Sequence, residues 1–99
     1  MQRVFVAPDA REFIKREAAY LRQHSEPAAA RFLMSLRSLK ERLSRFPQAG
    51  AMADNPALGR QIAFGQYVAY YDLRDRVIIT HMRHGRQRQP GEVFEDGDE

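Results

Sequence analysis

The chain has 99 residues, a formal net charge of +3 and 43% hydrophobic side chains, a composition that predicts one packed domain and excludes wholesale disorder. It contains no cysteine, which excludes disulfides and thiolate metal sites and permits a reducing compartment. No apolar run approaches the roughly 20 residues of a membrane span, and the first residues lack the apolar core of a signal peptide, so we expect a cytoplasmic protein without a membrane partner.

The chain begins with a predicted strand and a predicted helix. Gln2 to Val6 places valines on one face and a phenylalanine on the other, as a short strand does. Asp9 and Glu12 then stand at the spacing of a capping box, and apolar residues recur at helical spacing to about His24. We therefore expect a strand followed by an amphipathic helix.

A second helix is predicted directly after the first. Ser25 is a good N-cap residue and Pro27 suits a first helical turn, so the helix begins there and ends at Pro47. Its apolar residues share one face, and its arginines dominate the other. Because the connection is so short, the two helices should form an antiparallel hairpin.

The second half of the chain predicts strands. A loop from Gln48 to Pro56 precedes three strand-like runs at about Leu58 to Phe64, Gln66 to Leu73 and Arg76 to Arg83. Short turns separate the runs, so they should form an antiparallel meander. The expected fold is α+β in the order β-α-α-β-β-β, an antiparallel sheet with the helical hairpin packed on one face. The other face should be partly open.

Charge is distributed unevenly along the chain. Five of the 13 acidic residues lie in the last eight positions, so residues 1–91 carry 16 basic and eight acidic side chains. Only Lys15 and Lys40 of those cations are lysines, and the planar fork of arginine suits phosphate and carboxylate groups. The basic body therefore favours a polyanionic partner, either nucleic acid or an acidic protein segment, with simple solvation of the arginines as the alternative.

The acidic C-terminus is treated separately from the body. We expect residues 1–89 to form a single domain and residues 90–99 to be a flexible acidic tail. The alternative is that the tail folds back on the basic face and competes with a polyanionic ligand.

A basic cluster, Arg83-His84-Gly85-Arg86, stands at the end of the last predicted strand. Strict alternation places His84 on the helix-covered face, together with Ile78, Thr80 and Met82. It places Arg83 on the opposite face, together with Val77, Ile79 and His81. We therefore interpret His84 as a structural residue that holds the strand end through a backbone hydrogen bond. Arg83, with Arg60, is a better candidate for contact with a partner.

The sequence predicts neither a metal site nor a cofactor. His81 and His84 are three residues apart, so a strand would point them to opposite faces and a shared metal is not expected. The chain also has no glycine-rich phosphate loop.

Three stretches, taken in their order and spacing, resemble one known family. They are Leu43 to Pro47 followed by Gly50, then Gly59-Arg60 leading to Gly65 to Tyr71, and finally Met82 to Gln87. Over roughly residues 2–88 the chain resembles the RelE/ParE superfamily of small bacterial toxins, and within it the ParE-like, plasmid-stabilisation branch. The resemblance implies the toxin component of a type II toxin–antitoxin system, held inactive by a cognate ParD-like antitoxin.

The resemblance leaves two mechanisms open. ParE-like members are taken to poison DNA gyrase without hydrolysing anything themselves, whereas RelE-like members cleave messenger RNA in the ribosome. Metal-free RNA cleavage needs a base, an acid and cations that stabilise the phosphate. RelE-like enzymes draw these groups from lysines, arginines and a tyrosine or histidine near the C-terminus.

In this chain the nuclease set would be Arg60, Arg83, His84 and Arg86, and it is incomplete. No lysine follows residue 40 and no tyrosine follows residue 71. We therefore predict a ParE-like inhibitor of DNA gyrase rather than an enzyme. A ribosome-dependent mRNA endoribonuclease and a non-toxic, degenerate binding module remain the alternatives.

The antitoxin is predicted to bind two basic surfaces. One is the outer side of the helical hairpin, and the other is the open sheet face around Arg60 and Arg83. The candidate partner-binding residues are Arg31, Arg37, Arg60, His81, Arg83 and Arg86.

Overall fold

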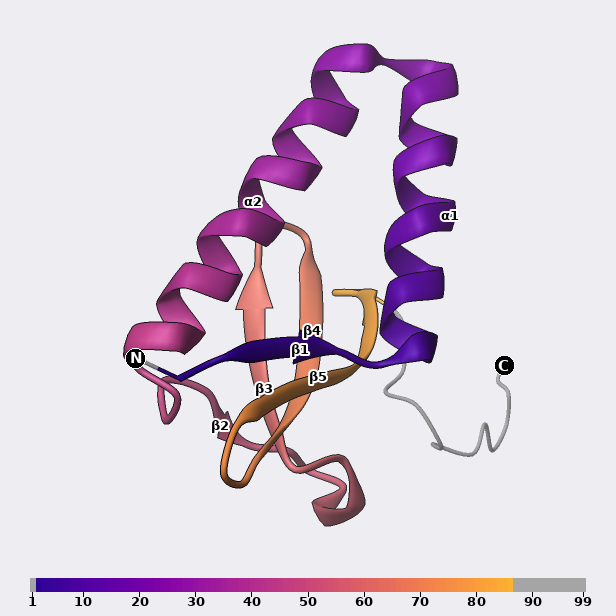
Figure 1. The fold of residues 1–99 in the computed structure, drawn as a ribbon. Helices are drawn as coiled ribbons and strands as arrows, with labels where there is room; N and C mark the ends of the chain where they lie inside the picture. Colours follow the sequence, from indigo (N-terminus) through magenta and orange to yellow (C-terminus); the bar gives the residue numbers. More distant parts are fainter. Residues whose placement is uncertain (1, 87–99) are drawn as a thin grey trace, which may run out of the picture.

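The computed structural model of the protein describes residues 2–86. The predicted domain boundary at residue 89 and the acidic segment after it lie outside the described residues. The predicted order of elements is confirmed, with a short strand added inside the predicted loop and a 3-10 turn added where that loop meets the next predicted strand. The elements are β1 (Val4–Val6), α1 (Pro8–His24), α2 (Glu26–Arg45), β2 (Ala51–Met52), η1 (Pro56–Leu58), β3 (Arg60–Phe64), β4 (Tyr67–Leu73) and β5 (Val77–His84) (Figure 1).

One serine separates the two helices and serves both. The backbone N–H of Ser25 donates to Leu21 O at the end of α1, and its side-chain oxygen accepts from Ala28 N at the start of α2. The predicted antiparallel hairpin follows from this tight connection. The predicted capping box of α1 is wrong, because Ala7 is the N-cap residue and Asp9 lies inside the first turn.

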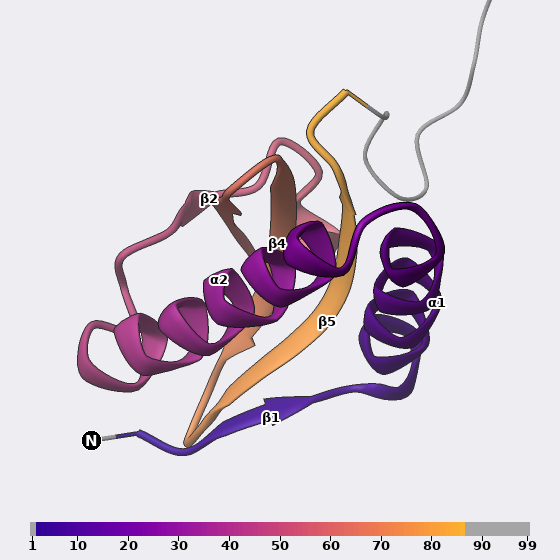
Figure 2. The same ribbon diagram turned by 90° about the horizontal axis from the view of Figure 1, so that it is seen from above.

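The last three strands form the predicted antiparallel meander, within a sheet of order β1-β5-β4-β3-β2. The sheet is mixed rather than wholly antiparallel, because β1 pairs in parallel with β5 from Val4↔Val77 to Val6↔Ile79. Figure 2 shows β1 running beside β5 toward the start of α1. The residues of β1 alone carry no information about the direction of a strand that follows them by some 70 positions in the chain. The parallel pairing of β1 with β5 could therefore not be predicted from the residues around β1.

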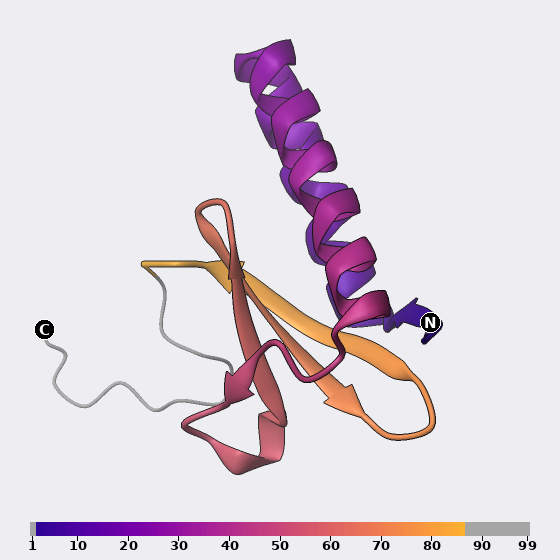
Figure 3. The same cartoon turned by 90° about the vertical axis from the view of Figure 1, so that its left-hand side faces the viewer.

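The main core lies between the helical hairpin and one face of the sheet, as predicted. Figure 3 shows the two helices on one side of the sheet, extending beyond it at the end where the β3–β4 turn lies. Apolar residues of α2 meet the inner side chains of β3, β4 and β5 in one cluster, whose least exposed members include Leu43, Ala69, Tyr71, Val77 and Ile79. Burial of this apolar area is the main stabilising term of the fold.

The opposite face of the sheet is only partly open. Ala53 and Leu58 pack against the fully buried Tyr70 of β4 and form a second, smaller cluster. The segment between β2 and β3 therefore covers the middle of this face. This segment does not cover the β1 edge of the sheet or the C-terminal end of β5.

Candidate functional site

A β-bulge in β5 decides which of its side chains face the helices. Tyr71 pairs with Ile79 but Tyr70 pairs with His81, so Thr80 is an extra residue and the alternation shifts at that point. Val77 and Ile79 consequently lie in the main core, and the prediction that they share a face with His81 and Arg83 is wrong. The register pairs Tyr67 with His84 and Val68 with Arg83.

His84 lies on the helix-covered face, as predicted, and its partner comes from helix α1. Its Nε2 is 3.2 Å from the Glu17 carboxylate, and its ring makes edge or tilted contacts with Phe13 and Tyr67. The Glu17 side chain is only 10% exposed, whereas that of His84 is 40% exposed. The interactions seen here are with a buried carboxylate and two aromatic rings, and the backbone hydrogen bond of His84 stays a prediction.

Glu17 also accepts a hydrogen bond from Tyr67, with 2.7 Å between the oxygens. Burial raises the pKa of the Tyr67 hydroxyl, and the hydrogen bond to Glu17 and the negative charge of that carboxylate raise it further. Tyr67 therefore stays protonated and donates. The buried Glu17 carboxylate therefore joins α1 to β4 and β5. In the sequence, the only sign of this role is that an acidic residue stands within an apolar stripe.

The Arg83 side chain folds back on the C-terminal end of its own strand, β5. Its Nε donates to the Tyr70 hydroxyl at 2.8 Å, and one terminal nitrogen donates to the carbonyls of His84 and Gly85. The Gly85 N–H in turn donates to Gln66 O in the β3–β4 turn. These bonds shape the exit of β5 on the open face.

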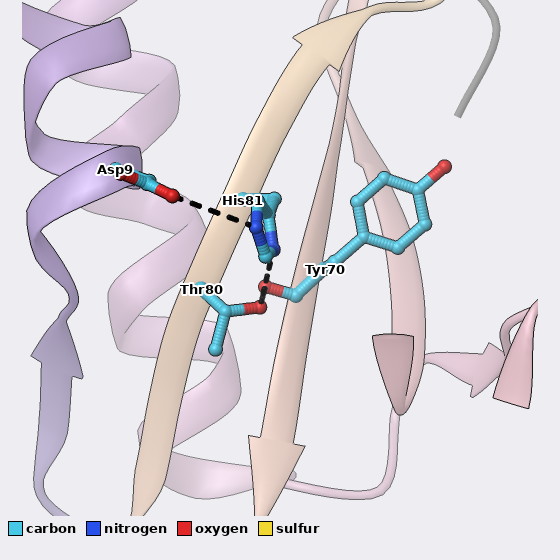
Figure 4. A network of polar contacts seen from close by, with 4 residues as sticks. All are labelled: Asp9, Tyr70, Thr80 and His81. Atoms are coloured by element: carbon cyan, nitrogen blue, oxygen red, sulfur yellow. Dashed lines mark hydrogen bonds and ion pairs between the residues drawn. The ribbon is translucent and has the colours of Figure 1, made fainter. Parts of the chain in front are cut away.

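His81 faces the open side of the sheet beside the bulge. Its Nδ1 is 3.1 Å from the Thr80 hydroxyl, which donates to Tyr70 O, and its Nε2 is 3.8 Å from the Asp9 carboxylate (Figure 4). Asp9 is well exposed, so this ion pair contributes little. The network fixes the bulged backbone and holds His81 near the start of α1.

Arg60 does not share the open face with Arg83, contrary to our expectation. It pairs with Tyr71, a member of the helix-side core, and donates to Gly50 O at 2.9 Å. The Tyr71 hydroxyl accepts from Gly50 N and donates to Pro47 O. Arg60 and Tyr71 thus anchor the chain that follows α2, and strict alternation in β3 puts the arginine on the covered side.

The remaining predicted residues are dispersed. Arg86 is exposed in the turn after β5, and Arg31 and Arg37 are exposed on α2. The structure therefore brings together Arg83, His81 and Tyr70 around the bulge. It does not bring Arg60, Arg31 or Arg37 to them. Among residues 2–86 no three histidine or carboxylate side chains are grouped as metal ligands, and neither helix of that range is long and apolar enough to cross a membrane.

A furrow along α2 is the feature that sequence reasoning missed. Between α2 and the β3–β4 turn lies a hollow of 540 Å³, and a smaller one continues to the end of the helix. The outer edge of β3 beyond Gln61 has no strand beside it in the described part of the chain. The residues of α2 and its C-cap that define the α2 furrow are Arg31, Met34, Ser38, Glu41, Arg42, Arg45 and Phe46, and Glu41 forms an exposed ion pair with Arg45.

The α2 furrow combines exposed apolar side chains with cations. Met34 is 69% exposed and Phe46 is 63% exposed, while Arg31 precedes Met34 by one turn and Arg42 lies between Met34 and Phe46. Residues at spacings of three and four share one helical face, so these groups form a stripe. Such a stripe suits an amphipathic segment that carries carboxylates.

Comparison with models of known protein families gives a match over most of the chain. The family model described as "ParE toxin of type II toxin-antitoxin system, parDE" matches residues 4–89. A search of curated proteins finds no match to the chain. The matched range spans every strand and helix described above.

Proposed function

The chain belongs to the ParE toxin family of type II toxin–antitoxin systems, and from this premise we propose that it inhibits DNA gyrase by binding, without catalysing a reaction itself. In this proposal the toxin acts in the cytoplasm, and a cognate ParD-like antitoxin neutralises it there. Gyrase as the target and neutralisation by a ParD-like antitoxin are proposals, whereas membership of the family rests on the match to the family model.

The observation that carries this proposal is the dispersal of the nuclease candidates. Cleavage of RNA needs an acid, a base and phosphate-stabilising cations around one phosphorus atom. Arg60 lies on the helix-covered face, Arg83 points at its own strand end, and His84 packs against Glu17. These groups do not converge on one substrate position, which favours a binding protein over a nuclease.

The α2 furrow is the best candidate for the antitoxin. An acidic amphipathic segment could place apolar side chains against Met34 and Phe46 and carboxylates against Arg31 and Arg42. Aromatic and methionine side chains in partly enclosed surfaces are typical anchors of protein interfaces. Arginines at the rim should make association faster at low salt.

A supercoiling assay tests the gyrase proposal. Purified full-length chain is added in increasing excess to gyrase and relaxed plasmid, and the expected result is loss of supercoiling with accumulation of cleaved DNA. Unchanged supercoiling at excess protein would refute the proposal. A translation-coupled RNA cleavage assay run in parallel should show no cut messages.

One contact favours the nuclease alternative and defines its test. A buried carboxylate that orients a half-exposed imidazole, as Glu17 does His84, is the arrangement of many acid–base pairs. If the chain is a nuclease, His84→Ala should abolish message cleavage while Arg37→Ala does not. Toxicity that persists in His84→Ala without codon-specific cuts excludes this alternative, and normal growth on expression of the wild type would indicate a non-toxic binding module.

A further inference from the structure

Three exposed arginines lie at the β1 edge of the sheet, and none of them lines the α2 furrow. Arg3 precedes β1, and Arg74 and Arg76 lie in the turn between β4 and β5. Figure 3 shows this turn close to the N-terminus and at the opposite end of the sheet from the β3–β4 turn. We call the three residues the Arg3 cluster.

Two of these arginines are held over one aromatic ring. The guanidinium carbon of Arg3 is 5.1 Å from the centre of the Phe5 ring, and that of Arg76 is 4.6 Å from it. The parallel register pairs Phe5 with Ile78, so both lie on the face of the sheet opposite the helices. A guanidinium stacked on a ring keeps its N–H groups free at its edge, where they can bind an oxyanion.

The backbone under the Arg3 cluster is fixed. Gln2 N donates to Ser44 O, the Ser44 hydroxyl donates to Gln2 O, and Val77 N donates to Arg3 O. Arg74 N donates to Arg76 O across the turn. The backbone that carries the three arginines is therefore ordered before a ligand arrives, and the Phe5 ring positions the guanidinium groups of Arg3 and Arg76, which lowers the entropy cost of binding.

No carboxylate of residues 2–86 forms an ion pair with the arginines of the Arg3 cluster. Asp72 and Asp75 belong to the same hairpin, yet within residues 2–86 no ion pair of 4.0 Å or less joins any acid to Arg3, Arg74 or Arg76. The guanidinium carbons of Arg3 and Arg76 both lie within 5.1 Å of the centre of the Phe5 ring, so an anion bound beside that ring would meet two positive charges.

From this geometry we propose that Arg3, Arg74 and Arg76 form a binding site for the phosphodiester backbone of nucleic acid. A protein partner would need an apolar anchor, but the aromatic ring here is already covered by the two guanidinium groups. A phosphate backbone needs no such anchor, since its contacts are charged and sequence-independent. The inference does not depend on gyrase being the target, and the position of the site leaves the α2 furrow free.

Fluorescence anisotropy with the full-length chain tests the proposal. Labelled duplex DNA, single-stranded DNA and single-stranded RNA are titrated at several salt concentrations, and the three probes identify which nucleic acid is preferred. The variant Arg3→Gln/Arg74→Gln/Arg76→Gln should bind at least about tenfold more weakly at 0.1 M salt, and its salt slope on duplex DNA should be smaller by roughly 2 to 3.

The matched control is Lys15→Gln/Arg16→Gln/Arg22→Gln, which removes the same charge from the exposed side of α1. It should lose much less affinity. Phe5→Leu keeps every charge and removes only the platform, so a loss of about two- to fivefold is expected. Thermal unfolding of each variant verifies that it is folded.

Three results would overturn the proposal: no salt-dependent binding by the wild type, equal losses in the two triple variants, or competition by polyglutamate as effective as that by DNA. The supercoiling assay on the Arg3 cluster variant keeps this test separate from the gyrase proposal. If the variant loses nucleic-acid binding, its effect on supercoiling still tests separately whether the protein inhibits gyrase.

Discussion

The two faces of the sheet use polar side chains differently. On the helix-covered face, Glu17, Tyr67 and His84 satisfy one another, and Arg60 and Tyr71 hold the chain after α2. On the open face, Arg83 is tied to its own strand end, whereas the Arg3 cluster has no carboxylate within ion-pair distance in the described part of the chain. Residues of the stretches that identify the family therefore support the fold, whereas Arg3, Arg74 and Arg76 lie outside those stretches.

The largest expected effect is steric and lies on the covered face. In Gly50→Ala the new Cβ would lie 2.6 Å from Gln61 O and 2.8 Å from the Tyr71 hydroxyl, so backbone and ring must move at a cost of about 3 kcal/mol in unfolding free energy. Denaturant unfolding measures it. Gly85→Ala, whose Cβ would be 3.1 Å from Gln66 O, should cost clearly less. Equal losses would contradict this difference between the faces.

Glu17→Ala should cost about 2 kcal/mol, because it leaves the buried Tyr67 hydroxyl without its acceptor. Combining it with Tyr67→Phe removes that orphan group, so the double variant should lose less than the sum of the single losses, by roughly 1 kcal/mol. A double-mutant cycle by chemical denaturation measures the coupling. Glu12→Ala, whose exposed ion pair with Arg16 lies on the same helix, should change stability by less than about 0.5 kcal/mol.

Alkaline pH should weaken the same contact. The folded pKa of Tyr67 is raised above the ordinary tyrosine value of 10.0, so above that pH the unfolded chain loses its proton first and unfolding becomes more favourable. Stability should fall by up to about 1.4 kcal/mol per pH unit in this window from Tyr67 alone. Tyr67→Phe should show a shallower decline in the same titration. Identical slopes would mean that the contact is not linked to folding.

On the open face, Arg83→Met should cost about 1 kcal/mol, since it removes the bonds to the Tyr70 hydroxyl and to two carbonyls of the strand exit. Hydrogen exchange of the β5 exit should rise in this variant. If stability and exchange are unchanged while partner binding is lost, Arg83 is a contact residue rather than a structural one.

The smallest effect is expected in the Arg3 cluster. Arg76→Gln removes an exposed charge that forms no ion pair with any residue from 2 to 86, so the free energy of unfolding should change by less than about 0.5 kcal/mol. Thermal unfolding checks this. A large loss would show that the cluster stabilises the fold rather than binding a ligand.

Local patterns predicted most of the fold. Proline and serine at the helix starts, apolar periodicity and short turns were enough for the helical hairpin and the meander. The family follows from the same local stretches, and the match over residues 4–89 confirms it. The assignment of His84 to the covered face was also correct, although it rested on an alternation that the bulge at Thr80 interrupts.

The placement of the charged residues was decided only by the tertiary structure. The parallel pairing of β1 with β5, the covered position of Arg60 and the meeting of Arg3 with Arg76 over Phe5 join segments far apart in the chain. The sequence by itself determined the elements, the basic character and the family, because periodicity, capping and composition act over a few residues. Partners of buried and exposed charges depend on strand register and long-range packing, which no local pattern contains.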